Sequence, residues 1–173
     1  MRHTALSLQR NTRFPPSMAD VRGFEVRARE NDEKVGKVDD LVCGTEGQIR
    51  YLDVGVGGLF NKKRVLLPVG VARADRTNDV VWIAGMTKDQ IRDLPEYDGN
   101  VDAITDDYEK SCCSPFRNRD AAPLADASST EPTESDLYDQ SRLYADRGGS
   151  ASRDARLVFS PESSDARESE QRM

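Results

Sequence analysis

Between residues 23 and 84 the chain is a series of short apolar segments, each bounded by polar residues that favour turns. Apolar and polar side chains alternate in GFEVRA (23–28) and QIRYLDVGV (48–56), which is the pattern of strands buried on one face. Further strand-like runs are VGKVDDLVC (35–43), RVLLPVG (64–70) and VVWIAG (80–85). Five or six short strands joined by polar turns predict an all-β fold, a small barrel.

One short helix is expected to follow the strands. The segment TKDQIRDLP (87–95) begins with Thr87, which suits a helix N-cap, and ends at Pro95, which cannot continue a helix. Two residues mark irregular positions among the strands. Gly36 predicts a β-bulge, and Pro68, which lacks an N–H, predicts a sheet edge or a bulge.

The glycine-rich stretch VGVGGLFNKKRV (54–65) is interpreted either as a phosphate-binding loop or as the turn of a β-hairpin. A P-loop needs a GK[ST] sequence before a helix, and the stretch lacks it. The dinucleotide fingerprint GxGxxG fails as well, because Phe60 stands where the third glycine belongs. Since a strand-like run follows, the sequence predicts a long hairpin. In it, the glycines supply twist and positive φ, and residues 62–64 form a solvated basic edge.

Composition divides the chain into a folded domain and two flanking regions. Hydrophobic residues make up 36% of the chain and the mean hydropathy is −0.71, so part of the chain is expected to lack a core. The predicted organisation is a flexible N-terminal segment at 1–17, a barrel domain at 18–98 and a mostly disordered acidic and polar tail at 99–173. Two apolar islands interrupt the tail, LYDQSRLY (137–144) and ARLVF (155–159). Each is interpreted as a short helix, a strand or a docking motif that folds on a partner.

Net charge and hydropathy argue against two common roles. The formal net charge is −6, and nucleic-acid binding needs clustered Lys and Arg, so direct nucleic-acid binding is not expected. No apolar run approaches the roughly 20 residues that span a bilayer. The N-terminal stretch does not resemble a secretory signal. We therefore expect a cytoplasmic protein.

The residues that usually carry catalysis or metal binding are scarce. Three cysteines and one histidine, His3, do not offer the spacing of a zinc site. Acid pairs such as Asp39–Asp40 fall at positions expected to be solvated. Since catalytic motifs are missing, we expect no enzyme, no metal and no cofactor. Cys112 and Cys113 are adjacent and are candidate redox thiols, with two reduced thiols on a mobile segment as the alternative.

A barrel without catalytic chemistry presents its surface to other proteins. The candidate partner-binding residues are Leu59 and Phe60 at the hairpin tip, together with Tyr51 and Trp82. The alternative for the tip is that it folds back over the barrel mouth and closes the core. Open strand edges of a small barrel also favour a homodimer.

Five segments, in order and at typical spacing, resemble the PRC-barrel domain. They are DVRGFEV (20–26), KVGKVDDLV (34–42), IRYLDV (49–54), KRVLLPVG (63–70) and TKDQIRDLPEYD (87–98). This small β-barrel is shared by the cytoplasmic part of the photosynthetic reaction-centre H subunit, by stand-alone bacterial proteins and by the ribosome-maturation factor RimM. The pattern is closest to the H-subunit-like branch. In that branch an acidic residue after Arg-aromatic-Leu lies near a proton route to a quinone, and the matching residue here is Asp53.

The resemblance implies a non-enzymatic protein-interaction or adaptor module with protein partners, a homodimer, and peripheral association with a membrane complex. The first alternative is an accessory subunit that assists electron or proton transfer at a photosynthetic or quinone-binding complex, with Asp53 as the proton-path residue. The structural alternative for Asp53 is a half-exposed strand carboxylate beside Arg50. The second alternative is a RimM-like role in ribosome maturation or RNA processing, which the acidic charge disfavours.

Overall fold

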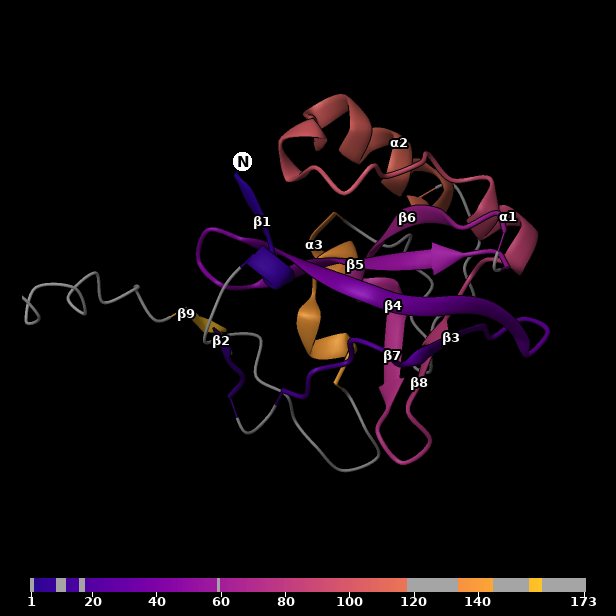
Figure 1. Ribbon diagram of the computed structural model, residues 1–173, viewed down its shortest axis with the longest axis horizontal. Coiled ribbons are helices and arrows are strands. Elements are labelled where there is room, and N and C mark those ends of the chain that lie inside the picture. Colours follow the sequence, from indigo (N-terminus) through magenta and orange to yellow (C-terminus); the bar gives the residue numbers. More distant parts are fainter. Residues whose placement is uncertain are drawn as a thin grey trace, which may run out of the picture.

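The computed structural model describes residues 2–8, 12–15, 18–58, 60–117, 134–144 and 156–159. Its centre is a seven-stranded sheet (Figure 1). The strands of this sheet are β1 (His3–Ala5), β3 (Glu25–Ala28), β4 (Glu33–Gly44), β5 (Ile49–Val56), β6 (Lys63–Pro68), β7 (Ala72–Asp75) and β8 (Val80–Ile83). A smaller sheet pairs β2 (Thr12–Arg13) with β9 (Val158–Phe159).

The longest strand, β4, organises the large sheet, whose strand order is β6-β5-β4-β3-β8-β7. One edge of β4 pairs with β5, and the other edge pairs with β3 near residues 33–37 and with β1 near residues 42–44. The sheet curls into a half-barrel whose hydrogen-bonded path ends at β6 and at β7 (Figure 1). The expected predominance of strands is confirmed, with few helices among the described residues. The strand count is seven rather than five or six, because β1 joins the sheet from a segment that we expected to be flexible.

Both end strands of the sheet bond to other segments of the same chain. On β6, Val65 forms a bridge with Glu96, and the Tyr97 N–H donates to the Arg64 carbonyl at 2.8 Å. On β7, the Ala74 N–H donates to the carbonyl of Leu143 at 2.8 Å. Backbone groups that an edge strand would offer to another chain are therefore partly used within this one.

Local sequence signals place the turns and the short helix as expected. Helix α1 (Lys88–Arg92) begins with a capping box, in which Thr87 and Gln90 exchange side-chain to backbone hydrogen bonds. Pro68 closes β6, the edge strand, as its missing N–H predicts. The register of β3 against β4 shifts next to Gly36, which confirms the predicted bulge.

Helix α2 (Asp106–Arg117) lies over β6, in the region where the sequence predicted a disordered tail (Figure 1). Its buried residues are Cys112, Cys113 and Phe116, spaced so that they share one side of the helix. Burying one side chain of the size of Phe116 contributes about 1.5–3 kcal/mol. The polar composition of the tail did not predict this helix. Three apolar residues in an otherwise polar segment suffice to cover a sheet face that is already formed.

The first apolar island of the tail also packs on the barrel. It forms α3 (Glu134–Leu137) and the short 3-10 helix η4 (Gln140–Arg142). Leu143 and Tyr144 are buried. The side-chain oxygen of Gln140 accepts a hydrogen bond from the Ile49 N–H at 2.9 Å. Of the three interpretations of this island, the structure bears out a short helix, and the helical segment packs on the chain's own sheet.

The second island docks in a similar way. The Leu157 N–H donates to the carbonyl of Gly47 at 2.9 Å, and Leu157 is buried. Strand β9 of this island pairs with β2 of the N-terminal segment. The structure therefore differs from the predicted boundaries at 17 and 98. Parts of both flanking regions complete the core, and the remaining positions of the predicted tail lie outside the described residues.

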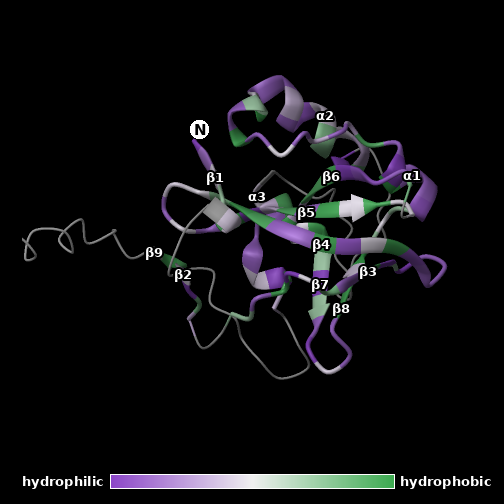
Figure 2. Cartoon of the chain, in the orientation of Figure 1, coloured by the Kyte–Doolittle hydropathy of each residue, from purple (hydrophilic) through white to green (hydrophobic). Residues whose placement is uncertain are grey.

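Strand β5 is buried on both faces, although its alternating sequence predicted one exposed face. Leu52 and Val54 point to one side and Tyr51 and Asp53 to the other, and all four are buried. Figure 2 shows hydrophobic residues running along the central strands, while the helices and turns around them are largely hydrophilic. The additional cover comes from α2 and the docked islands. This cover decides which candidate residues remain accessible.

Candidate functional site

The glycine-rich stretch forms the β5–β6 hairpin, as predicted. The two strands pair antiparallel up to Val56 and Lys63. Gly57 has a φ of +111°, which L side chains rarely adopt, and a Cβ there would lie 2.3 Å from the Asn61 carbonyl oxygen. The turn thus requires glycine for its own closure, and a strand rather than a helix follows it.

Phe60 lies at the tip of this hairpin and its exposed fraction is 101%. Phe60 therefore does not fold back over the barrel mouth, which was the alternative for the tip. Its neighbour Leu59 lies outside the described residues. Val158, with an exposed fraction of 57%, is the other large hydrophobic residue exposed in the described part of the chain.

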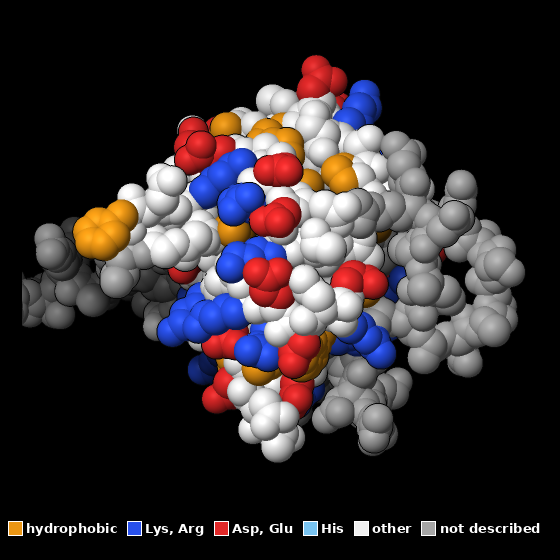
Figure 3. Space-filling model, turned by 90° about the vertical axis from the view of Figure 1, so that its right-hand side faces the viewer, with side chains coloured by type: hydrophobic (Ala, Val, Ile, Leu, Met, Phe, Trp, Pro, Cys, Tyr) orange, Lys and Arg blue, Asp and Glu red, His pale blue; other side chains and the backbone are white. Residues whose placement is uncertain are grey.

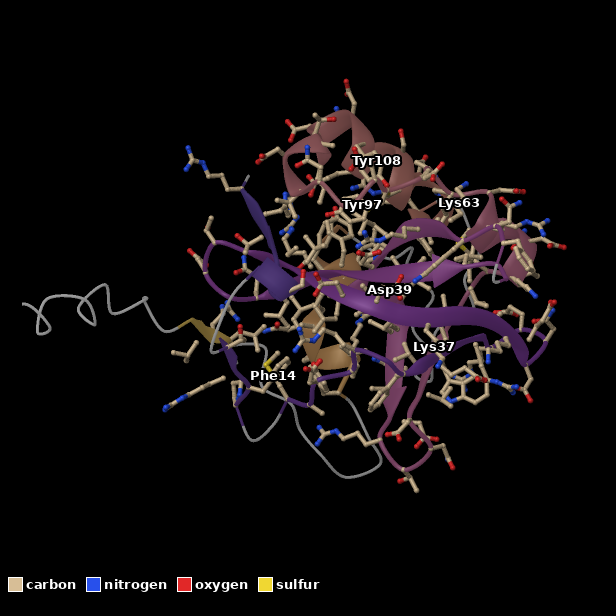
Figure 4. All side chains as sticks on the ribbon, viewed as in Figure 1. Phe14, Lys37, Asp39, Lys63, Tyr97 and Tyr108 are labelled. Carbon is tan, nitrogen blue, oxygen red and sulfur yellow. The ribbon has the colours of Figure 1, made fainter. Side chains whose placement is uncertain are left out.

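A groove of about 350 Å³ runs beside the hairpin, between β4 and the loop after β5. Its charged lining residues are Lys34, Lys37, Asp39 and Lys62, and glycines of both strands complete it. Figure 4 shows Lys37 and Asp39 on β4 and Lys63 on β6. Figure 3 faces the end of the molecule toward which β5 runs. On this face Lys and Arg side chains are interspersed with Asp and Glu side chains.

Trp82 is half-buried on β8, where it pairs in register with Arg27 of β3 and Arg73 of β7. In the sheet, strands β3 and β4 lie between β8, which carries Trp82, and the β5–β6 hairpin, whose tip carries Phe60. The candidate partner-binding residues therefore do not form one surface.

Tyr51 lies in the interior, with 1% of its surface exposed. Its hydroxyl donates to Glu109 Oε1 at 2.8 Å and lies 2.6 Å from the Tyr138 hydroxyl. The Nε2 atom of His3 lies 3.1 Å from the same Glu109 oxygen, without the angles of a hydrogen bond. His3 and the Tyr51 hydroxyl hold the pKa of Glu109 below its ordinary value. This network joins the N-terminal strand, β5, α2 and the first island, so Tyr51 serves the core.

Asp53 is likewise buried, with 1% of its surface exposed. Arg64 donates to both carboxylate oxygens, with Nε 3.1 Å from Oδ1 and a second bond from its terminal nitrogen to Oδ2. Burial raises the pKa of Asp53, and Arg64 opposes that rise. Arg50, the partner expected from sequence, instead lies 3.7 Å from Glu109. Arg64 was missed because the register matters: Asp53 faces Leu66 on β6, and Arg64 is the diagonal neighbour.

The two candidate redox thiols are both buried in α2. Burial raises the pKa of the Cys112 thiol to about 12, and it also raises the pKa of Cys113. The Cys113 Sγ atom lies 3.1 Å from the Tyr138 hydroxyl. Thiols in this setting stay protonated at neutral pH, which disfavours nucleophilic or redox chemistry.

Comparison with known proteins identifies the part of the chain that contains the hairpin. Residues 17–90 match the family model of the PRC-barrel domain. The chain contains a PRC-barrel domain. A Deinococcus radiodurans protein described as uncharacterized is 46% identical over 68 residues, which are 39% of this chain and 24% of that protein. The chain thus matches about a quarter of that relative's length.

The PRC-barrel match begins near Met18 and ends within α1, so the predicted family is confirmed for this region. Helix α2 and both docked islands lie after the matched residues. Within the described ranges, no helix combines the length and apolar character that a bilayer crossing requires. The same ranges hold no group of three or more His, Cys, Asp or Glu side chains placed to bind a metal.

Proposed function

We propose that this chain is a non-enzymatic interaction module that binds a protein partner through the tip of the β5–β6 hairpin of its PRC-barrel domain. One observation carries the proposal: Phe60 is fully exposed at the end of a turn that glycine geometry holds in place. Burying an aromatic side chain of this size, relative to leaving it in water, is favourable by about 1.5–3 kcal/mol. Exposed aromatics of this kind are typical anchors of protein interfaces.

The closed parts of the molecule support the choice of the tip. Tyr51 and Asp53 are enclosed by the chain itself, and the edge strands β6 and β7 already bond to residues near Tyr97 and Leu143. A homodimer through open strand edges is correspondingly less favoured than a contact at the hairpin. The resemblance to the reaction-centre H subunit, which is part of a larger protein complex, agrees with a role in binding.

The test is affinity purification of the tagged full chain from its native host. We compare the wild type with the variants Phe60→Ala and Val158→Ala. Val158 is the matched control, because it is also an exposed apolar side chain but lies on β9. We expect a discrete partner protein that the wild type and Val158→Ala retain and that Phe60→Ala loses.

Equal recovery of the partner by Phe60→Ala would contradict the proposal, provided that circular dichroism shows the same fold for all three proteins. A partner lost with Val158→Ala and kept with Phe60→Ala would move the interface to the β2–β9 sheet.

A further inference from the structure

The β-bulge in β4 places two lysines, Lys34 and Lys37, in the lining of the groove beside the hairpin. Val26 pairs with Gly36 and the next residue, Arg27, pairs with Lys34, so Val35 is the extra residue. Without the bulge, Lys34 and Lys37 would point to opposite faces of the strand. The bulge turns Val35 into the core and leaves both lysines on the outer face.

Two glycines form the floor of this groove. Gly36 and Gly55 lie on neighbouring strands, and a Cβ on Gly36 would stand 1.8 Å from the Gly55 carbonyl oxygen. A Cβ on Gly55 would project into the groove, 2.4 Å from Cε of Lys62 and 2.7 Å from Oδ2 of Asp39. The floor is thus formed by backbone, and the ion pair between Lys62 and Asp39 lies over the buried Gly55.

The charges around the floor leave one cation unmatched. The Nζ atom of Lys62 lies 2.7 Å from Oδ2 of Asp39, and Nζ of Lys34 lies 2.9 Å from Oε2 of Glu25. The side chain of Lys37, on the same face, has no ion pair or hydrogen bond with the residues that the structure describes. Lys37 is exposed, and its ammonium is the one available to a new anion.

We propose that this groove binds an extended acidic peptide segment of the partner, with a carboxylate on Lys37 and an apolar side chain on Phe60. This inference rests on the proposed function of the hairpin tip. The loop brings the two contacts together, since Phe60 precedes the groove residue Lys62 by two positions. A volume of about 350 Å³ suits a few residues of peptide.

A short peptide fits these charges better than a polyanion does. Asp39 and Glu25 stand among the lysines, and the whole chain has a net charge of −6. A nucleic acid or an anionic bilayer would meet these carboxylates over a wide area and be repelled. A peptide that carries one or two carboxylates needs only the local match at Lys37.

The test measures binding of a fluorescein-labelled peptide, in which glutamates flank a central leucine, to the full chain by fluorescence anisotropy at low salt. The same peptide with glutamines in place of glutamates is the probe control. The protein variants are Lys37→Glu, which reverses the unmatched charge, and Gly55→Ala, which fills the floor by displacing flexible side-chain ends. Lys110→Glu is the matched control, because Lys110 is an exposed lysine on α2 whose nearest carboxylate, on Asp107, is 3.9 Å away.

We expect saturable binding that weakens roughly tenfold or more in Lys37→Glu and in Gly55→Ala, while Lys110→Glu binds as the wild type does. The glutamine peptide should bind as weakly as the Lys37→Glu variant binds the glutamate peptide. No saturable binding, or binding that both groove variants leave unchanged, would overturn the inference. Lys37-dependent binding to phosphatidylglycerol vesicles in preference to the peptide would also overturn it and assign the groove to an anionic membrane surface.

The two proposals fail separately. If Phe60→Ala loses the natural partner but the groove variants bind the peptide normally, the interaction function stands and the acidic-peptide inference falls. If the peptide binds through Lys37 while Phe60→Ala keeps its partner, the groove stands as a peptide site and the hairpin tip is not the anchor.

Discussion

The two ends of the β5–β6 hairpin are built from one continuous sequence, yet their surroundings are opposite. At the base, Tyr51 and Asp53 lie beneath segments that follow the PRC-barrel domain and are almost completely buried. At the tip, Phe60 contacts solvent on all sides. The chain uses its own flanking segments to close one end and leaves the other open. A polar or aromatic residue at the base therefore serves stability, and the tip is where a partner can be recognised.

The largest effect is expected from removing part of the cover that the flanking segments provide over the core. Leu143→Ala removes a fully buried side chain of the docked first island, next to the bond from Ala74 to its carbonyl. Its loss should lower the free energy of unfolding by about 2–4 kcal/mol, because transfer and cavity terms add. Urea denaturation measures it, with Val158→Ala as the control. A change no larger than that of the control would show that this island does not close the core.

A somewhat smaller effect is expected from Arg64→Leu, which leaves the buried Asp53 carboxylate without its cation. We expect a loss of about 2 kcal/mol near neutral pH. This is below the range for fully buried pairs, because the Arg64 side chain is 36% exposed.

The pH dependence of this variant has a definite sign. The pKa of Asp53 is already raised, and without Arg64 it rises further. The folded state then takes up a proton more readily than the unfolded state, so the deficit relative to wild type should shrink as the pH falls toward about 5. Arg64→Lys, which keeps the charge, should show a smaller loss that hardly changes with pH. A deficit that grew on acidification would contradict this account of the Asp53–Arg64 pair.

Glu109→Gln should cost about 1 kcal/mol near neutral pH, since the amide weakens the contacts to His3 and Tyr51 at the base. The pKa of Glu109 is lowered in the folded protein. The stabilisation by the carboxylate is therefore present above its unfolded pKa and is lost as the pH falls through the folded value. Thermal melts over a pH series should show the wild type converging on the variant below about pH 4. If the melting temperatures of the wild type and the variant ran parallel over the whole pH series, the ionised Glu109 carboxylate would not stabilise the fold.

The smallest effect on stability is expected at the open end. Phe60→Ala should change the free energy of unfolding by less than about 0.5 kcal/mol, because the side chain is already in water. Urea denaturation beside Leu143→Ala makes the contrast between the covered core and the exposed hairpin tip quantitative. A loss of more than about 1 kcal/mol would mean that Phe60 packs within the protein and is not a free anchor.

Local patterns in the sequence were sufficient to predict the elements whose structure depends on residues adjacent in sequence. The period of two in QIRYLDVGV predicted β5, the missing GK[ST] predicted a hairpin, and Thr87 predicted the start of α1. The cover on the second face of β5 was not predictable in this way. It comes from Glu109, Cys113 and Tyr138, which lie in polar segments far away in sequence and meet at Tyr51 only once the sheet exists.

The candidate site was predictable in part for the same reason. Phe60 follows from a turn signal and an apolar residue at its tip, which are local features. The partner of Asp53 was not predictable, because the register of β5 against β6 decides it. The bulge at Gly36 was expected, but its consequence for Lys34 appears only when both neighbouring strands are in place.

The most direct test of the account is site-specific photo-crosslinking in the native host. A photoreactive phenylalanine analogue replaces Phe60 in one full-length protein and Val158 in another. We predict a crosslink to one discrete protein from position 60 and none to that protein from position 158. A specific crosslink from position 158, with position 60 giving no more than background, would contradict the claim that the open end of the hairpin is the interaction surface.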